Sequence, residues 1–439
     1  MGDMSETFVP EPTADDAVAF RRGELNPREY AAAICARIET VDAELEAFVA
    51  EPERRERLHA ELRELVRRWP DVEDRLPLFG VPIGVKDVLH VDGLPTRAGS
   101  RLAPETLAGP EASVVTRLRA AGAVVAGKTV TAEFAFTAPG PTRNPHDRDH
   151  TPGGSSSGSA AAVAAGMVPL ALGTQTVGSV IRPAAYCGVV GFKPGYRRIP
   201  SGGLISNAPT FDTVGFLCRD LELLTAASSA ACTAWRVGVR IERMPVLGVP
   251  AGPYLEQAEP EALKAFEDQV ARLGAAGFPI RRVEMLCTIH EVNQRNAVIN
   301  LAELAHSHVH LFPTHSERYH ETTAAAIREG QQVPRAAYER ALAEREEFAA
   351  QIVDLMDTHN VDLWIAPAAT GPAPEGLGST GSPVMNLPWT QARFPVITVP
   401  VGRATGGLPL GLQCVGRPGA DELLLGRAHL LMRALARSR

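Results

Sequence analysis

An uncharged stretch of 31 residues, 151–181, constrains the fold of this chain more than any other feature. It is longer than the roughly 20 apolar residues that a membrane-spanning helix requires. Glycine, serine, threonine and proline dominate its ends, however, and only residues 160–172 are consistently apolar or small. We therefore predict no membrane span but a buried segment, in which a glycine- and serine-rich loop leads into a helix of small residues and then a strand.

The residues before this stretch alternate between helix and strand patterns. Asn26 and Pro27 are typical of a helix start, and charged helices follow as far as residue 69. Residues 78–87 alternate apolar and small side chains, which predicts a strand whose end presents Lys86. This alternation of helices and strands indicates an α/β sheet.

Further elements are expected along the rest of the chain. The predicted helices are 113–121 and 420–437, the predicted strands are 123–127, 361–366 and 394–401, and the region 259–357 is mostly amphipathic helix. We interpret 259–357 as a helical insertion that contributes to the substrate region. Because there is no repeat of fixed period and no flexible linker, one large domain is favoured over several small ones.

The composition excludes several classes of partner. With 44 Lys+Arg against 51 Asp+Glu and a formal net charge of -7, the chain lacks the positive surface that nucleic acids and anionic membranes attract. Residues 1–12 contain no basic or apolar signal-peptide region, so we expect a cytoplasmic protein. Six cysteines lie far apart without a CxxC pair, which favours buried reduced thiols over disulfides or a zinc site.

Two loops of small residues flank the predicted helix of the uncharged stretch. The first loop, 151–159, contains Ser155, and the second, 173–179, ends at Ser179. A glycine- and serine-rich run is often a flexible linker, but a linker is not normally followed at once by an alanine-rich helix. Since loop, helix, strand and loop return the chain to one edge of a parallel sheet, the two serines can meet at that edge.

No histidine or aspartate near these loops offers a catalytic triad, which leaves Lys86 as the candidate base. A lysine at a strand end among apolar and small residues can be desolvated until it is neutral at pH 7; the alternative is a lysine that simply reaches solvent. Gly154-Ser-Ser-Ser-Gly158 also satisfies the G-x-S-x-G pattern of a nucleophile elbow. That pattern requires a hydrophobic strand before it, and residues 147–150 are polar.

Three separated blocks of this sequence resemble the amidase signature family. They are residues 80–87 with 93–96, the run 153–162, and Gly178-Ser179 leading to 183–194. The strong resemblance covers the signature core, 78–220, while the N-terminal helices and residues 380–416 match more loosely. The resemblance implies a single α/β/α domain, 1–439, with a large mixed sheet that helices cover on both faces.

The family's chemistry, transferred to the matching positions, implies a Ser-cisSer-Lys site without cofactor or metal. Ser179 matches the acylated nucleophile, Ser155 matches the bridging serine after a cis peptide bond, and Lys86 matches the base. The residues expected to hold the oxyanion or the substrate lie beside these serines: Gly154, Thr176, Val177 and Gly178. The implied activity is hydrolysis of a carboxylic amide C–N bond to an acid and an amine or ammonia, through a seryl acyl-enzyme.

The chain departs from the family around the nucleophile. Where the family commonly has Asp-Thr-Gly-Gly-Ser-Ile-Arg, this chain has Gln175-Thr-Val-Gly-Ser-Val-Ile181 followed by Arg182. A side chain at Val177 can narrow the acyl pocket or restrict the turn that aims the oxyanion donors. We expect these changes to affect the range of substrates more than the chemistry.

Two other motifs suggest different functions. His306, His308 and His310 could bind a metal, but the helical pattern before them places only the first and last on one face, so we expect no metal site. Residues 122–129 formally match the P-loop pattern G-x-x-x-x-G-K-[ST]. The four intervening residues are themselves the predicted strand and cannot wrap phosphates, so we expect no nucleotide.

Three functions remain open. The leading one is an amidase that acts on a small-molecule amide. The second is an amidotransferase of the type whose amidase chain releases ammonia for a partner and purifies with another chain. The third is a non-catalytic binding protein on the same scaffold, suggested by Gln175, Val177 and Ile181. Small apolar residues near the loops suggest a modest uncharged acyl group, and a homo-oligomer is compatible with the sequence.

Overall fold

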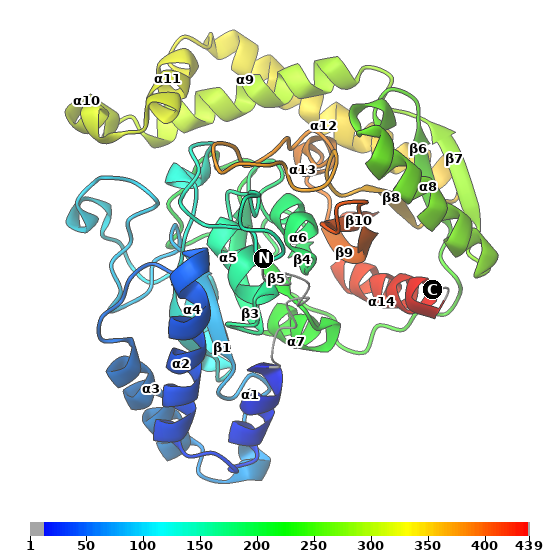
Figure 1. Ribbon diagram of the computed structural model, residues 1–439. Coiled ribbons are helices and arrows are strands. Elements are labelled where there is room, and N and C mark those ends of the chain that lie inside the picture. The colour runs from blue at the N-terminus through cyan, green and yellow to red at the C-terminus, as the bar shows by residue number, and fades with distance from the viewer. Residues whose placement is uncertain (1–12, 438–439) are drawn as a thin grey trace, which may run out of the picture.

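The computed structural model describes residues 13–437, so the expectation about residues 1–12 lies outside the described part of the chain. A mixed sheet of ten strands, in the order β2-β1-β3-β5-β4-β9-β10-β8-β6-β7, runs through the molecule (Figure 1). The strands are β1 (Pro82–Lys86), β2 (Val124–Thr129), β3 (Leu170–Gln175), β4 (Val190–Lys193), β5 (Thr213–Cys218), β6 (Leu247–Ala251), β7 (Ile280–Glu284), β8 (Leu363–Pro367), β9 (Val396–Arg403) and β10 (Pro409–Gly416).

The helices fall before, between and after these strands. They are α1 (Thr13–Arg21), α2 (Pro27–Leu45), α3 (Arg54–Arg68), α4 (Ser113–Ala120), α5 (Ser157–Ala164), α6 (Ile181–Cys187), α7 (Leu221–Ala231), α8 (Pro260–Ala275), α9 (Ile289–Ser307), α10 (Phe312–His315), α11 (Glu321–Gly330), α12 (Arg335–Thr358), α13 (Leu387–Gln391) and α14 (Asp421–Arg437). Short 3-10 helices lie at Val72–Asp74, Pro104–Leu107, Glu133–Ala135, Leu255–Gln257 and Ser316–Arg318.

The sheet has two halves that follow the order of the chain. Strands β1 to β5 form one half and strands β6 to β10 form the other, and β4 joins them by pairing antiparallel with β9. Each half ends in three parallel strands, β2-β1-β3 and β8-β6-β7, and the strands between them pair antiparallel. The architecture confirms the predicted α/β fold with a large mixed sheet.

Helices cover both faces of the sheet. Helices α5 and α6 pack on one face, against β1 to β3 and against β4, β9 and β10 respectively, while α7 and α14 lie on the other face (Figure 1). Helices α1 to α3 lie at one end of the molecule, and α9, α11 and α12 form a separate helical layer at the top of the view in Figure 1. The central strands of the sheet therefore lie between layers of helices.

Strand directions bring three segments to one edge of the sheet. Strands β1 and β3 are parallel, so their last residues, Lys86 and Gln175, lie at the same edge. Strand β5 runs antiparallel to β3 and its first residue, Thr213, pairs with Gln175. The residue before β5, Asp212, therefore lies at this edge as well.

Several sequence expectations are confirmed and others require correction. Asn26 caps α2 by accepting hydrogen bonds from the backbone N–H groups of Arg28 and Glu29, each at 3.0 Å. The region 259–357 is mostly helical, but it also contains β7, an edge strand with exposed arginines that resembles a helix pattern in sequence. The second small-residue loop begins only after Gln175, because residues 173–175 belong to β3.

The structure also tests the predictions about the cysteines and about a membrane span. All six cysteines are free thiols, and five are buried as expected, whereas Cys287 is exposed. Across residues 13–437, no helix combines the length and the apolar character needed to cross a bilayer.

Candidate active site

Lys86, the last residue of β1, is fully buried and lies among hydroxyl groups. Its Nζ is 2.7 Å from Ser155 Oγ, 2.8 Å from Thr174 Oγ1 and 3.3 Å from the Thr174 carbonyl oxygen. A neutral amine has two N–H donors and one lone pair. As an ammonium Lys86 donates to all three oxygens; in the neutral amine two N–H groups suffice for the two oxygens of Thr174, and the lone pair can accept the proton of the Ser155 hydroxyl.

The surroundings of Lys86 favour the neutral amine. Burial lowers the pKa of Lys86 from 10.5 to about 7, and the positive charge of Arg182 acts in the same direction, while the nearby Asp212 carboxylate opposes the shift. Near neutral pH a large fraction of Lys86 is thus unprotonated. This is the protonation state that a proton acceptor requires.

Asp212 is held by donors rather than by a cation. Its carboxylate accepts hydrogen bonds from Thr176 Oγ1 at 2.6 Å, Ser206 Oγ at 2.6 Å and the backbone N–H of Asn207 at 2.8 Å. Burial nevertheless raises the pKa of Asp212, and these donors oppose the rise. Asp212 therefore binds the turn that begins at Thr176, and its charge also affects the pKa of Lys86.

Small residues are required where the Ser155 loop enters α5. A side chain at Gly158 would place its Cβ 2.1 Å from the Ala47 carbonyl oxygen, so only glycine permits this approach. The carbonyl of Ser155 accepts a hydrogen bond from the Ala132 N–H at 3.1 Å, which ties the loop to the segment after β2. The Gly154–Ser155 peptide bond is cis, as the family resemblance implies.

Ser156, the centre of the G-x-S-x-G match, has a structural position. Its side chain is fully buried, and its Oγ donates to the Thr174 carbonyl and accepts from the Thr174 N–H, both at 3.3 Å. This hydroxyl is engaged with the backbone of β3. This geometry agrees with the lack of the hydrophobic strand that a nucleophile elbow requires before its serine.

Ser179 lies on the turn between β3 and α6 and is 7% exposed. In the described part of the chain its Oγ forms no hydrogen bond, so no bond joins it to Ser155 in this conformation. The backbone N–H groups of Val177, Gly178 and Ser179 likewise have no acceptor among residues 13–437. The turn thus presents free donors beside a free hydroxyl, which is the arrangement that a developing oxyanion needs.

Gln175 explains how the turn keeps its shape without the acid common in the family. Its Oε1 accepts hydrogen bonds from the N–H groups of Val180 and Ile181 at 2.9 and 3.0 Å, and its Nε2 donates to Thr390 Oγ1 at 2.8 Å. Thr390 Oγ1 in turn donates to the Val177 carbonyl at 2.7 Å. An amide both accepts and donates in this chain of bonds, whereas a carboxylate only accepts.

Gly178 is required by a close neighbour. A Cβ at this position would lie 2.5 Å from Asn386 Oδ1 and 3.2 Å from Asn386 Cβ. The Asn386 amide is fixed, because its Nδ2 donates to the Ala368 carbonyl at 2.8 Å and to Gln413 Oε1 at 3.2 Å. The half-buried Val177 side chain packs against the main core.

The other motifs have structural roles. The predicted strand 123–127 corresponds to β2, which spans Val124–Thr129, and Lys128 pairs with Asp87 at 2.8 Å rather than facing a phosphate site. His308 is buried, with Nδ1 2.9 Å from Tyr319 Oη, whereas His306 and His310 are exposed. Over the described chain, no group of three or more His, Cys, Asp or Glu side chains is arranged to hold a metal ion.

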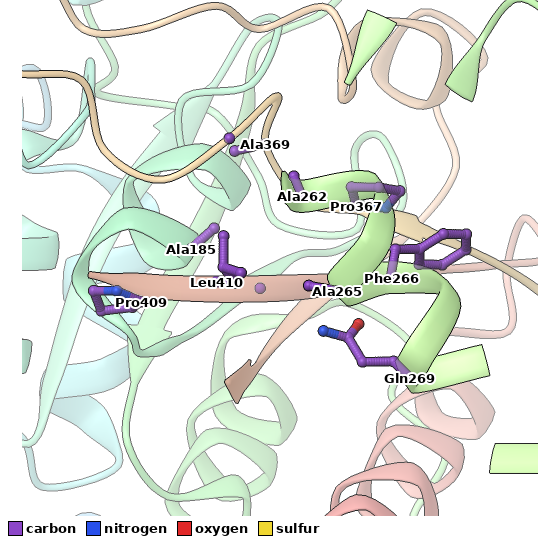
Figure 2. Close-up of a pocket in the computed structure, with 11 residues that line it drawn as sticks. Ala185, Ala262, Ala265, Phe266, Gln269, Pro367, Ala369, Pro409 and Leu410 are labelled. Atoms are coloured by element: carbon purple, nitrogen blue, oxygen red, sulfur yellow. The ribbon is translucent and has the colours of Figure 1, made fainter. Parts of the chain in front are cut away.

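A small cavity lies near α6, between that helix, α8 and β10 (Figure 2). Its volume is about 10 Å³ and alanine and proline side chains dominate its lining, as Figure 2 shows for Ala185, Ala262 and Pro409. A space of this size holds no more than about one water molecule. Neither Lys86 nor the two serines line it, so it is not a substrate site.

Sequence reasoning missed several residues of this site. The sequence predicts Thr174 in the second loop, but Thr174 lies near the end of β3. The small residues at the end of this strand resemble those of the loop that follows. Asp212 precedes a strand that the sequence analysis does not predict, and Asn386 and Thr390 lie beside and on the short helix α13. The single signal in the sequence is the acidic residue at the start of the apolar run 213–218.

Comparisons with known proteins show the family to which this chain is similar. The profile of the Amidase family matches residues 29–425. The glutamyl-tRNA(Gln) amidotransferase A chain of Thermus thermophilus is 34% identical over 469 aligned residues, which cover 95% of this chain and 96% of that protein. An amidase crystal structure aligns with a TM-score of 0.85 and 29% identity over 98% of this chain and 100% of its own. The peptide amidase of Stenotrophomonas maltophilia aligns with a TM-score of 0.81 and 26% identity over 98% of both chains.

Proposed function

This chain belongs to the amidase family, and we propose that it hydrolyses carboxylic amides through an acyl-enzyme on Ser179, with Ser155 as the bridge and Lys86 as the base. The observation that carries the assignment is the environment of Lys86. A buried amine with a pKa of about 7 lies 2.7 Å from the Ser155 hydroxyl and donates to Thr174 Oγ1 at 2.8 Å, so in its neutral form it can accept the Ser155 proton.

Acylation begins with proton transfer along this line. Neutral Lys86 takes the proton of the Ser155 hydroxyl while Ser155 takes the proton of Ser179, whose side chain turns toward it. Ser179 Oγ then bonds to the amide carbon, and the carbonyl oxygen becomes an oxyanion. The N–H groups of Val177, Gly178 and Ser179 stabilise that charge, with a contribution of about 3–4 kcal/mol per donor in comparable sites.

Collapse of the tetrahedral intermediate breaks the C–N bond. The proton held on Lys86 returns through Ser155 to the leaving nitrogen, which departs as an amine or ammonia. Water then attacks the ester carbon and gives its proton to the same relay. The ester bond breaks, Ser179 recovers its proton, and the acid is released.

The outer helical region contributes to the site indirectly. The Gln391 side chain on α13 donates to the Val292 carbonyl of α9 at 2.8 Å and accepts from Arg295 at 3.0 Å. The neighbouring Thr390 contacts the oxyanion turn. We propose that residues 259–357 shape the substrate region through α13, within one domain whose signature core is 78–220.

A fluorophosphonate probe tests the assignment directly. Intact-mass spectrometry should detect one adduct on the wild-type chain and none on Ser179→Ala, with slower labelling of Ser155→Ala because the bridge is lost. Ser156→Ala is the matched control: it removes a neighbouring buried hydroxyl and should keep the adduct. An adduct that persists in Ser179→Ala, or a wild-type chain that neither labels nor hydrolyses any amide, would contradict the proposal.

A second candidate is the amidase chain of an amidotransferase. The Thermus thermophilus relative carries that name and aligns along nearly the whole chain. Such a protein would release ammonia to a partner, so it should co-purify with another chain from its source cells and hydrolyse glutamine faster with that partner than alone. An isolated chain with full activity on simple amides would exclude this candidate.

A further inference from the structure

Helix α9 carries polar side chains along the face that packs on the rest of the molecule. Asn293, Asn296, Asn300, Glu303 and Ser307 follow one another at intervals of three or four residues, so they lie along one side of the helix. Asn296 and Glu303 are 3% and 5% exposed, and the other three are half-buried. Such a face is normally apolar, so these polar side chains require partners.

The two ends of this polar face are bonded to the layer beneath. The first half of α9 is joined to Gln391 of α13, as described above. In the second half, Glu303 accepts from the N–H and the hydroxyl of Thr210 at 2.8 and 2.6 Å, and Ser307 donates to the Asn207 carbonyl at 3.2 Å. Helix α9 is therefore anchored on α13 at one end and on the segment before β5 at the other.

Both anchors of α9 also contact the turn between β3 and α6. Helix α13 reaches this turn through Thr390, which donates to the Val177 carbonyl at 2.7 Å. The segment before β5 reaches it through Asp212, which accepts from Thr176 at 2.6 Å. In Figure 1, α13 lies between the layer that contains α9 and the sheet. The middle of α9 therefore lies over the turn that presents the nucleophile.

The asparagines in the middle of α9 lack partners. In the described part of the chain, Asn296 Nδ2 and Asn300 Oδ1 are buried and form no hydrogen bond. Asn207, which lies beneath α9, has a third such atom: its Oδ1 is unpaired, while its Nδ2 donates to the Ala135 carbonyl at 3.3 Å. A buried amide atom without a partner is unfavourable, so these side chains favour a ligand that both donates and accepts.

The charged residues beside these asparagines are already paired. Arg295 donates to Glu344 at 3.1 Å, and Glu303 accepts from the Tyr338 hydroxyl at 2.8 Å in addition to Thr210. The groups left unpaired are therefore neutral amides. A carboxamide is the matching ligand, because its carbonyl accepts from one asparagine while its N–H donates to another.

The acyl part of a substrate is the part that faces α9. The leaving nitrogen receives its proton through Ser155, which contacts Lys86 at the end of β1, so this nitrogen lies on the side of β3 that β1 occupies. The anchors of α9 precede β5 and β9, and both of these strands lie on the other side of β3. The acyl part, bonded to Ser179, therefore extends toward α9.

We propose that Asn296 and Asn300 bind a second, neutral carboxamide on the acyl part of the substrate, so that the preferred substrates are diamides of which one amide is cleaved. This inference rests on the proposed function and names its substrate class. It keeps the uncharged acyl group that the small apolar residues suggested and adds a polar group to it.

The test compares amides that differ only in the second group. We expect at least one of malonamide, succinamide and glutaramide to be hydrolysed with a kcat/KM about 10- to 100-fold above that of the branched amide of the same shape, which for succinamide is 4-methylpentanamide. Two neutral hydrogen bonds give a preference of this order. The matching amic acids should also be poorer substrates than the diamides. Equal or better use of the branched amides or of the amic acids would overturn the inference.

A substrate with two different amides tests the assignment to the acyl part. N-Acetylglycinamide should release ammonia, because that cleavage leaves the second amide on the acyl part. Release of acetate instead would place the second amide on the leaving part and overturn the inference.

Variants connect the preference to α9. Asn296→Leu and Asn300→Leu keep the size of the side chain but remove its amide, and each should reduce the ratio of diamide to branched-amide kcat/KM by about tenfold. Gln294→Met is the matched control, because it removes an amide from the exposed face of the same helix. The ratio is measured within one variant, so a general loss of folded protein does not change it. An unchanged ratio in both asparagine variants would overturn the inference.

A binding measurement separates this inference from the proposed function. In Ser179→Ala, ligand-detected NMR should show glutaramide binding about tenfold tighter than 5-methylhexanamide, and adding Asn296→Leu should remove the difference. No difference in Ser179→Ala would overturn the inference, while fluorophosphonate labelling of the wild type still supports the amidase. Diamide binding that depends on Asn296, in a chain that neither labels nor hydrolyses any amide, would support the binding site and overturn the amidase proposal alone.

Discussion

Two lysines in this molecule have nearly the same ionisation but different neighbours. Lys86 ends β1 and Lys193 ends β4, and both are fully buried. Burial lowers the pKa of each from 10.5 to about 7, and each has a carboxylate nearby that opposes the shift, Asp212 for Lys86 and Asp421 for Lys193.

The difference lies in what each amine contacts. Lys86 Nζ contacts the hydroxyls of Ser155 and Thr174, whereas Lys193 Nζ donates to the Pro194 carbonyl at 3.0 Å. A carbonyl has no proton to give, while a serine hydroxyl has one that leads to a nucleophile. A depressed pKa therefore does not by itself make a lysine a base; a proton donor within reach of its lone pair is also required.

The largest expected effect is a loss of activity when Lys86 is replaced but not when Lys193 is replaced. Lys86→Met should lower kcat/KM for a neutral amide by about 10³-fold or more, because the relay loses its proton acceptor. Lys193→Met should stay within about tenfold of the wild-type value, since Lys193 contacts no group of the relay. Steady-state kinetics on both variants, with circular dichroism to verify folding, measures the contrast. Similar losses in two folded variants would remove the distinction.

A smaller effect is expected in the pH dependence of the reaction. Protonated Lys86 cannot accept the Ser155 proton, so kcat/KM for a neutral amide should rise with pH and level off above about pH 7. At pH 5 the value should be about 100-fold below the plateau. The same profile is expected for Lys193→Met. A midpoint that moves when Lys193 is replaced would show that the titration belongs to Lys193 and not to Lys86.

The smallest effect concerns stability and belongs to Lys193. Its folded pKa of about 7 lies below the unfolded value of about 10.4, so the unfolded chain binds more protons between these values. This group therefore makes the free energy of unfolding rise from pH 7 toward pH 10. Lys193→Met should reduce that rise by at least about 1 kcal/mol in urea unfolding at the two pH values. An undiminished rise would show that Lys193 does not titrate as described.

Local sequence patterns predict the elements that depend on local forces. The Asn26 cap, the strand predicted at 123–127 and the position of Lys86 at a strand end follow from side chains within one turn or one strand. Strands β5 and β10 are not predicted, although their apolar runs contain glycine just as the predicted strand β1 does. Their places in the sheet depend on pairing with distant strands.

Some contacts of the candidate site are likewise predictable from the sequence, and others are not. The contact of Lys86 with Ser155 is expected from the family resemblance, and the position of Lys86 at a strand end is expected from its own segment. The contacts of Arg182 are not, since its bond to Thr380 joins residues 198 positions apart. Such a contact has no signature in the sequence near either residue, and only the surrounding packing reveals it.

The order of the strands places two groups of site residues in different parts of the chain. The three residues of the proposed relay lie in the half that ends at Cys218, whereas Thr380, Asn386 and Thr390 come from the later half and contact the first half. Recombination between relatives after α7 would exchange the residues that contact the two serine loops and keep Lys86, Ser155 and Ser179 together. Such an arrangement lets substrate range diversify by inheritance of a new second segment while the chemistry is passed on unchanged.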